Sequence, residues 1–437
     1  MIMSFYINAR LPSVYLVAIL ILGTCLFLIM RSAMKYFDQA FPKYDELNAS
    51  VQENVSAIRV VKAYVREDHE TSKFHKAAEN IYKIFCKAEE NLSFNAPLMQ
   101  LTVYSCILLI SWLGAKMIVG SSLTTGELMS LLTYCMNILM SLMMLSMVFV
   151  MITMSLASAR RITEVLNEKS DLDNPENPDF DIPDGSITFD HVYFNYKKGA
   201  GEPVLSDINL SIKSGETIGI IGGTGSAKTS LVNLISRLYD VTEGSIKVGG
   251  KDVRSYDMET LRNEVAVVLQ KNVLFSGTIL DNLRWGDKNA SEEECKRVCR
   301  LACADEFIDR MPEGYNTYIE QGGSNVSGGQ KQRLCIARAL LKKPKVLILD
   351  DSTSAVDTAT DAKIRKAFLT EIPETTKLII AQRISSVQDA DRIIVMENGK
   401  VNGFGSHEEL LKTNEIYREV YESQTGGGGD FDEKRGE

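Results

Sequence analysis

Apolar residues gather into three long stretches in the first part of this 437-residue chain. Leu11 to Met30 is an uncharged run of 20 residues. As a helix it spans about 30 Å, the thickness of the hydrocarbon core of a bilayer. A second stretch runs from about residue 96 to 119, and a third stays uncharged from Leu128 to Ala159. The pattern predicts three membrane-spanning helices, the last long enough to tilt or to project beyond the bilayer.

Basic residues mark the cytoplasmic ends of these helices. Arg31 and Lys35 follow the first stretch, and Arg160 and Arg161 follow the third; such residues are enriched on the cytoplasmic side. Residues 32–95 are polar with a helical pattern, so the first helix is expected to continue into the cytoplasm, turn and return. A multi-pass location in the cell membrane follows, with every residue after 161 in the cytoplasm.

The third stretch is rich in methionine. Flexible thioethers suit a surface that accepts varied apolar ligands. Contact with lipid or with neighbouring helices is the plainer explanation. Both interpretations apply to Met136, Met140, Met143, Met144, Met147, Met151 and Met154.

The rest of the chain has the pattern of a soluble α/β domain centred on one glycine-rich turn. An apolar strand, Thr217–Ile221, precedes the turn, and a helical pattern follows it. This is the layout of a phosphate-binding loop, in which backbone N–H groups surround phosphates at a helix N-terminus. Lys228 would reach the β- and γ-phosphates, and Thr229 would place its hydroxyl on Mg²⁺. ATP and Mg²⁺ are the expected cofactors, held by Gly222, Gly223, Thr224, Gly225, Ser226, Ala227, Lys228, Thr229 and Ser230.

Two further motifs lie downstream of this loop. Val346 to Leu349 is a continuous apolar run, as expected for a strand buried on both faces of a parallel sheet. It ends in Asp350, which can hold the hydration shell of Mg²⁺. The second motif opens another helix, whose N-terminus offers a second cradle for phosphate, formed by Ser327, Gly328, Gly329 and Gln330. Because one ATP needs one cradle, the second is expected to serve an ATP held by another subunit.

Composition narrows the class of protein further. The formal charge of −9 argues against a nucleic-acid partner, which usually meets a basic face. Cys295, Cys299 and Cys303 recur every four residues and would line one helix face. They could form a three-thiolate metal site, but small apolar packing in a reducing cytosol is the plainer account.

In combination, these motifs resemble those of ATP-binding cassette (ABC) exporters, of the half-transporter type with a fused membrane domain. The resemblance covers nearly the whole chain. Gly222–Thr229 resembles the Walker A motif and Val346–Asp350 the Walker B motif. Asn325–Gln330 is similar to the family signature, with Val326 where leucine is usual. The implied fold is an α-helical membrane domain joined to an α/β nucleotide-binding domain with a helical subdomain.

The resemblance also implies roles for residues outside these motifs. Gln270 matches the Q-loop glutamine, which senses the γ-phosphate, reaches Mg²⁺ and contacts the membrane domain. Tyr196, at the end of a strand expected over Ser186–Tyr196, matches the adenine-stacking aromatic, although a lone tyrosine there is more often ordinary strand surface. Asp357 matches the D-loop that begins at Ser354. The segment around residues 65–68 resembles the second coupling helix, which docks on the nucleotide domain of a partner.

Several positions depart from the family pattern. The general base, a glutamate after Walker B, is Asp351 here, and the switch histidine is Gln382. A shorter side chain moves the carboxylate by about an ångström, and such a misplacement can cost on the order of 10²-fold in rate. Glutamine can still donate to a γ-phosphate but cannot become cationic. Ala227 replaces a Walker A glycine, where its methyl group is expected to intrude on the phosphate, and Gln321 replaces a glutamate before the signature.

Asp351, Gln382 and Ala227 belong to the one ATP site whose Walker motifs this chain supplies, whereas the signature and the D-loop are intact. The resemblance therefore implies a heterodimer with one degenerate and one competent site, the partner being a second ABC half-transporter. The exported substrate is expected to be apolar or amphipathic. Two alternatives stay open: a non-hydrolytic regulatory or inactive subunit, and a cassette ATPase of the DNA-repair type, against which the membrane spans argue.

The predicted domain boundaries follow from these assignments. A partial membrane domain covers residues 1–161, a linker 162–184, the nucleotide-binding domain 185–424 and a flexible tail 425–437. The membrane domain of the family has six helices, and three are legible here, so residues 1–10 are expected to be the end of a preceding helix and its outside turn.

Overall fold

The computed structural model describes residues 2–7, 10–197, 201–351 and 355–425, and it divides into two compact units, Met1–Lys169 and Ser170–Glu437. We call these unit 1 and unit 2. Ser354 of the predicted D-loop, most of the predicted tail and the side chain of Met154 lie outside the described residues.

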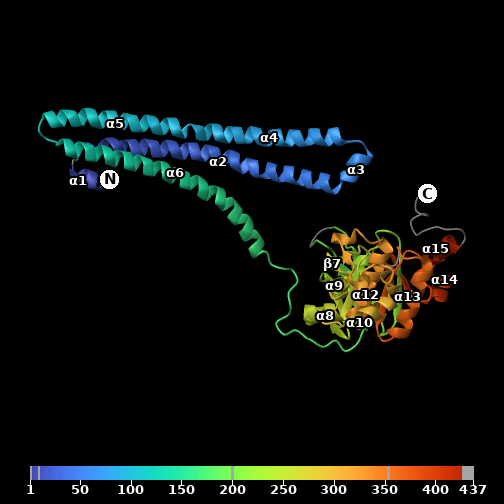
Figure 1. The fold of residues 1–437 in the computed structure, drawn as a ribbon. Coiled ribbons are helices and arrows are strands. Elements are labelled where there is room, and N and C mark those ends of the chain that lie inside the picture. The colour runs from blue at the N-terminus through green and yellow to red at the C-terminus, as the bar shows by residue number, and fades with distance from the viewer. Residues whose placement is uncertain (1, 8–9, 198–200, 352–354, 426–437) are drawn as a thin grey trace. The chain divides into compact units, whose positions relative to one another are not determined.

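Unit 1 consists of long helices that lie side by side (Figure 1). Their bounds are α1 Ile2–Ile7, α2 Pro12–Ser56, α3 Ile58–Ala63, α4 Glu67–Ser93, α5 Asn95–Val119 and α6 Thr125–Asn167. Three stretches of them are long and apolar enough to cross a membrane. The predicted order of a span, a long polar excursion, a second span, a short turn and a third span is therefore confirmed. The helices share a small core that includes Tyr15, Leu22, Ile110 and Leu139.

Helix α6 extends over the first six residues of the predicted linker. Helix α6 continues through residues 162–167 and ends where Glu168 adopts an extended backbone, with φ −61° and ψ 124°. The sequence from Ile162 to Asn167 contains neither glycine nor proline, and Pro175 is the first helix breaker after it. The helix therefore continues beyond Ala159, where the uncharged stretch used to predict the start of the linker ends.

Unit 2 is built on two sheets. The larger has the order β12-β11-β3-β10-β9-β6, with β12 alone antiparallel to its neighbour. Its strands are β3 Thr217–Ile221, β6 Val265–Val268, β9 Val346–Asp350, β10 Thr376–Ile380, β11 Arg392–Glu397 and β12 Lys400–Gly405. The smaller sheet is antiparallel, in the order β2-β1-β4-β5, and comprises β1 Ile187–Phe194, β2 Leu205–Ile212, β4 Glu243–Val248 and β5 Lys251–Asp252. A third pair joins β7 Gly277–Thr278 to β8 Tyr318–Ile319.

Helices cover the larger sheet and fill the connections. The α-helices are α7 Lys228–Ile235, α8 Met258–Glu264, α9 Ile279–Leu283, α10 Glu292–Leu301, α11 Asp305–Ile308, α12 Gly328–Leu341, α13 Thr358–Glu371, α14 His407–Thr413 and α15 Glu415–Thr425. Short 3-10 turns are η1 Val253–Ser255, η2 Gly314–Asn316, η3 Gln321–Gly323 and η4 Ile384–Ser386.

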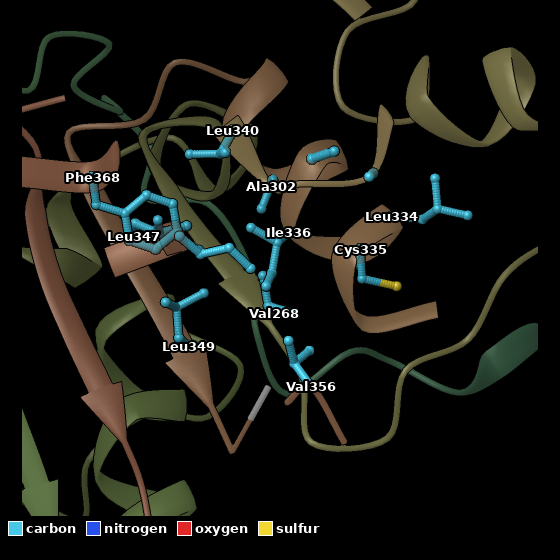
Figure 2. Packing of buried hydrophobic residues seen from close by; sticks show 14 of the residues in the cluster. Val268, Ala302, Leu334, Cys335, Ile336, Leu340, Leu347, Leu349, Val356 and Phe368 are labelled. Carbon is cyan, nitrogen blue, oxygen red and sulfur yellow. The ribbon is translucent and has the colours of Figure 1, made fainter. Parts of the chain in front are cut away.

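The central strands are buried on both faces, as the continuous apolar run at Val346–Leu349 predicts. Leu347 and Leu349 pack into one core with α12 and α13, and Val346 and Ile348 pack into a second core beneath the smaller sheet. Figure 2 shows the first core, where Ile336 and Leu340 of α12 lie over β9. This packing fixes the carboxyl ends of β3, β9 and β10, the edge that carries the predicted site.

The cysteines confirm the packing interpretation. Cys295 and Cys299 of α10, Cys303 just beyond it and Cys335 of α12 are all buried in the first core. Among the described residues, no group of three histidine, cysteine or carboxylate side chains could hold a metal ion.

Candidate nucleotide-binding site

The loop between β3 and α7 has the shape of a phosphate cradle. At Gly222 an added Cβ would lie 2.3 Å from the Met396 carbonyl oxygen, and Gly225 has φ +82°, a conformation that glycine adopts readily. The Lys228 ammonium lies within the loop and donates to the carbonyl oxygens of Gly222 at 2.7 Å and Gly223 at 2.8 Å. It also reaches Ser226 Oγ at 3.3 Å. Lysine and loop are thus held together at the N-terminus of α7, where anions are favoured.

A hydroxyl and a carboxylate meet beside this cradle. Thr229 Oγ1 donates to Asp350 Oδ2 at 2.8 Å, joining α7 to the end of β9. Asp350 is only 2 % exposed, and burial raises the pKa of its carboxyl above the usual value, while Thr229 and Lys228 act in the opposite direction. Two hard oxygen ligands next to a phosphate site suit Mg²⁺, which commonly takes one or two protein ligands together with phosphate oxygens and water.

The three residues predicted for the reaction lie together. Gln382 Nε2 donates to Asp351 Oδ2 at 3.2 Å, and Gln270 Nε2 reaches the same oxygen at a long 3.5 Å. The backbone N–H of Asp351 donates to the Ile380 carbonyl oxygen at 3.1 Å. The Asp351 backbone has φ 48°, a region in which aspartate is one of the more tolerated residues. Two neutral amides therefore flank the carboxylate, where the family pattern has a longer carboxylate and a titratable imidazole.

Tyr196 lies just beyond its strand. β1 ends at Phe194, two residues short of the predicted end, where its last pairing partner is Leu205 of β2. The Tyr196 ring meets Phe194 at 4.8 Å and Tyr239 at 5.1 Å, both edge-to-face, and its hydroxyl lies 2.8 Å from Ser230 Oγ. The side chain remains 51 % exposed, so a braced aromatic ring stays accessible at the end of α7 where a base could stack.

The signature residues form the capped start of α12. Ser327 N–H donates to Gln330 Oε1 at 2.9 Å, and Gln330 N–H donates to Ser327 Oγ at 3.3 Å. This reciprocal capping box fixes the helix N-terminus. Gly329 packs so closely that an added Cβ would lie 2.7 Å from the Ala355 carbonyl oxygen. The Gln330 side chain therefore belongs to the helix cap, and Ser327 and Gly328 provide the exposed part of the motif.

Gln332 and Tyr239, which the sequence analysis did not single out, also contact residues of the predicted site. Gln332 Oε1 accepts a hydrogen bond from the Ala355 backbone N–H at 3.0 Å, which ties α12 to the segment before the predicted D-loop aspartate. Asp357 begins α13 by accepting from the Thr360 N–H at 2.9 Å, and these backbone hydrogen bonds lower the pKa of its carboxyl. Tyr239 is the third ring of the aromatic group around Tyr196. No sequence motif marks Gln332 or Tyr239, because each acts through a contact distant in sequence.

Ala227 raises a conformational question. It precedes α7 with φ 68° and ψ 23°, the left-handed region that costs an L-residue about 1–2 kcal/mol. Its methyl group packs against the second core beneath the loop. The conformational free energy of this alanine therefore lies in its backbone. Because the methyl group packs against the core, the collision with phosphate expected from the sequence is a weaker explanation.

The donor set fits ATP with Mg²⁺. The glycine loop and Lys228 would hold the phosphates, Thr229 and Asp350 the cation, and Tyr196 the base; the role of Gln270 at the cation stays a prediction. A phosphate-binding loop, a buried aspartate on a neighbouring strand and a capped signature helix, in one chain with helices fit to cross a membrane, define a membrane-bound transport ATPase.

The chain belongs to the ABC transporter family. Residues 205–354 match the family described as ABC transporter, and residues 1–143 match the ABC transporter transmembrane region. The chain is therefore a membrane protein and a subunit of an ATP-driven exporter.

Individual relatives agree with this assignment. The chain is 39% identical to an uncharacterized ABC transporter ATP-binding protein, YfiB of Bacillus subtilis, over 97% of this chain and 74% of that protein. It is 37% identical to an ATP-dependent lipid A-core flippase of Desulfotalea psychrophila, over 96% of this chain and 73% of that one. A bacterial Atm1-family ABC exporter with ATP bound matches with a TM-score of 0.87 at 27% identity, over 95% of this chain and 73% of that chain.

Proposed function

We propose that this chain is the degenerate-site subunit of a heterodimeric ABC exporter. It binds ATP–Mg²⁺ at its own Walker motifs, hydrolyses it slowly, and lends its signature to a competent site on a second half-transporter. For this proposal we name two groups of residues. The Walker side comprises Gly222–Thr229, Asp350, Asp351 and Gln382, and the signature side comprises Ser327–Gln330 and Asp357.

The observation that carries the proposal is the clustering of the substituted residues. Asp351 and Gln382 are hydrogen-bonded to each other, and Ala227 lies in the loop whose Lys228 and Thr229 serve the same phosphate site. On the signature side, Ser327, Gly328 and Gly329 keep the family residues and begin an ordered, capped helix. The three departures nearest the phosphate site thus belong to one composite ATP site, as expected for two chains with unequal sites, whereas Val326 and Gln321 depart at and before the signature.

The chemistry of the Walker side supports slow hydrolysis. A general base must approach the attacking water within about 3 Å, and the shortened Asp351 side chain instead meets the Gln382 amide at 3.2 Å. A neutral amide can orient the γ-phosphate by donating a hydrogen bond but cannot offset the charge that develops during transfer. By contrast, the residues expected to bind the phosphates and Mg²⁺, among them Lys228, Thr229 and Asp350, match the family pattern.

The membrane unit supports an apolar or amphipathic substrate. A cavity of about 420 Å³ lies between α2 and α6 and is lined by apolar side chains, among them Leu26, Phe27, Met30, Leu145 and Phe149. Of the eight methionines of α6, seven have described side chains, and all seven expose much of their surface on this chain. Pockets of this size and lining bind largely apolar ligands.

The test restores the family residues on the Walker side. In the full chain reconstituted in lipid nanodiscs, steady-state ATPase is compared between the unsubstituted protein and the double variant Asp351→Glu with Gln382→His. We expect slow or no turnover by the unsubstituted chain and a rise on the order of 10²-fold in the double variant, because the base regains its reach.

A matched control adds Lys228→Ala to the double variant, which should abolish the gain and so locate the activity at this site. Brisk turnover by the unsubstituted chain alone would contradict the proposal. ATPase that stays low in the double variant and also after mixing with a candidate partner would favour the non-hydrolytic regulatory subunit.

A further inference from the structure

The last described helix of unit 2 holds the backbone beside Gln382. Gln424 lies in the final turn of α15. Its side-chain oxygen accepts a hydrogen bond from the Ile384 backbone N–H at 2.8 Å, and its amide nitrogen donates to the Gln382 backbone oxygen at 3.0 Å. One side chain thus pairs with both polar backbone groups that flank Arg383.

The geometry is that of an added strand. Arg383 is extended, with φ −100° and ψ 131°. In an extended segment the carbonyl of one residue and the N–H two residues later point to the same side, as in an antiparallel ladder. The Gln424 amide carries one donor and one acceptor group, as a neighbouring peptide would. It therefore braces the segment from Gln382 to Ile384 at two points.

Helix α15 is itself fixed at its start, about two turns before Gln424. Tyr417 is fully buried, and its hydroxyl lies 2.6 Å from His407 Nδ1 of α14. Asn414 Oδ1 accepts from the Tyr417 N–H at 2.9 Å, and Asn414 Nδ2 donates to Asn402 Oδ1 of β12 at 2.7 Å. Gln424 lies seven residues after Tyr417, on the same helix face. The brace is therefore attached to a rigid element.

We propose that Gln424 is a positioning residue for the switch loop, the segment Gln382–Ile384. It fixes the Gln382 backbone and hence the direction of the Gln382 side chain, whose amide meets Asp351. The inference rests on the proposed function, in which Gln382 faces the γ-phosphate. A hydrogen-bonded route then runs from the C-terminal helix through Gln424 and Gln382 to Asp351.

The test compares ATP with ADP, because ADP lacks the γ-phosphate that the switch loop would face. Gln424→Leu removes both hydrogen bonds at similar volume, in the full chain in nanodiscs. We expect the affinity for ATP, measured by direct titration, to fall about threefold to tenfold, in line with two neutral hydrogen bonds, and the affinity for ADP to stay unchanged. The matched control is Glu419→Leu, an exposed position of the same helix, which should change neither affinity.

Each other outcome has a distinct meaning. Equal losses for ATP and ADP would reduce Gln424 to a structural residue and overturn the inference, as would no change in either affinity. Gln382→Ala is measured in parallel. If it leaves the preference for ATP intact, the proposed role of Gln382 fails. If it lowers that preference while Gln424→Leu does not, only the positioning role fails.

Discussion

The Walker side and the signature side of unit 2 are built from neighbouring strands and helices, but they differ in how their helices are capped and in their backbone conformation. On the signature side, α12 starts with a complete capping box, and α13 starts with Asp357, whose side chain caps the helix. On the Walker side, two of the three substituted positions, Ala227 and Asp351, have positive φ values of 68° and 48°. Ala227 also gives α7 no side-chain cap. Positive φ values therefore coincide with two of the substitutions on the Walker side, and the signature side is held by local hydrogen bonds.

Under the proposed function, this difference indicates that residues are retained or replaced according to which of the two shared ATP sites they serve. Gln332 and the capping box hold the signature in a form that a nucleotide on another chain could meet. The Walker side keeps the groups that bind phosphate and has changed the groups beside them. The proposed function therefore predicts that substitutions can separate nucleotide binding from nucleotide hydrolysis at this site.

The largest effect is expected on the signature side. Ser327→Arg places charge and bulk at the start of α12, so that closure around a partner's ATP is blocked. ATPase of the heterodimer should fall about 10²–10³-fold, the range seen when one key transition-state donor is lost. Ser324→Arg adds the same side chain three residues earlier at an exposed position and should retain most activity. A similar collapse in both variants would contradict the specific role of Ser327.

A smaller effect should follow from removing the aromatic ring on the Walker side. Tyr196→Ala deletes a stacking platform, and base–aromatic stacking contributes about 1–3 kcal/mol. We expect the affinity of this chain for ATP to fall about tenfold in a direct titration. Tyr196→Phe keeps the ring, losing only the contact with Ser230, and should bind nearly as well as the unsubstituted protein. Unchanged affinity in Tyr196→Ala would show that the base lies elsewhere.

Removing the shortened carboxylate should matter less. Asp351→Ala takes away a base that is already misplaced, so heterodimer ATPase should drop only a few-fold in the assay used for Ser327→Arg. The ratio of the two losses measures how unequal the sites are. Equal losses would identify Asp351 as a working base and remove the asymmetry on which the proposal depends.

The smallest effect is expected at Ala227. Because the backbone already has φ 68° and the methyl packs against the core, Ala227→Gly relieves strain equally with and without nucleotide. ATP affinity should change by less than about threefold. The free energy of unfolding should change by less than about 1 kcal/mol, since the relief is offset by the greater freedom of glycine in the unfolded chain. Tightening by more than tenfold would restore the argument from collision with phosphate.

Sequence periodicity predicted the elements that rest on strong patterns. The strands at Thr217–Ile221 and Val346–Asp350 were placed correctly, because burial on both faces leaves a continuous apolar run. Apolar length alone identified the membrane helices. The end of β1 was misplaced because the alternation of residues does not show where pairing with β2 and β4 stops.

The residues of the candidate site likewise fall into those that the sequence predicted and those that it did not. Sequence patterns predicted the roles of Lys228, Thr229 and Asp350, and the family resemblance added Asp351 and Gln382. Strand order places the loops of all five residues at one edge of the sheet. Gln424 was missed, since its partners are backbone groups about forty residues away and any backbone can accept or donate. The left-handed conformation of Ala227 was also missed, because conformation is not legible from residue identity alone.

The capping box of Ser327 and Gln330 has a consequence for the speed at which two chains can join. A segment that must order itself upon contact slows docking, and ordering entropy is subtracted from the affinity gained. Here the helix start is already held by its own side chains before a second chain arrives. In the proposed heterodimer, closure at this end would therefore need no prior folding of the signature helix, and the association rate would depend on nucleotide arrival and on the orientation of the two domains.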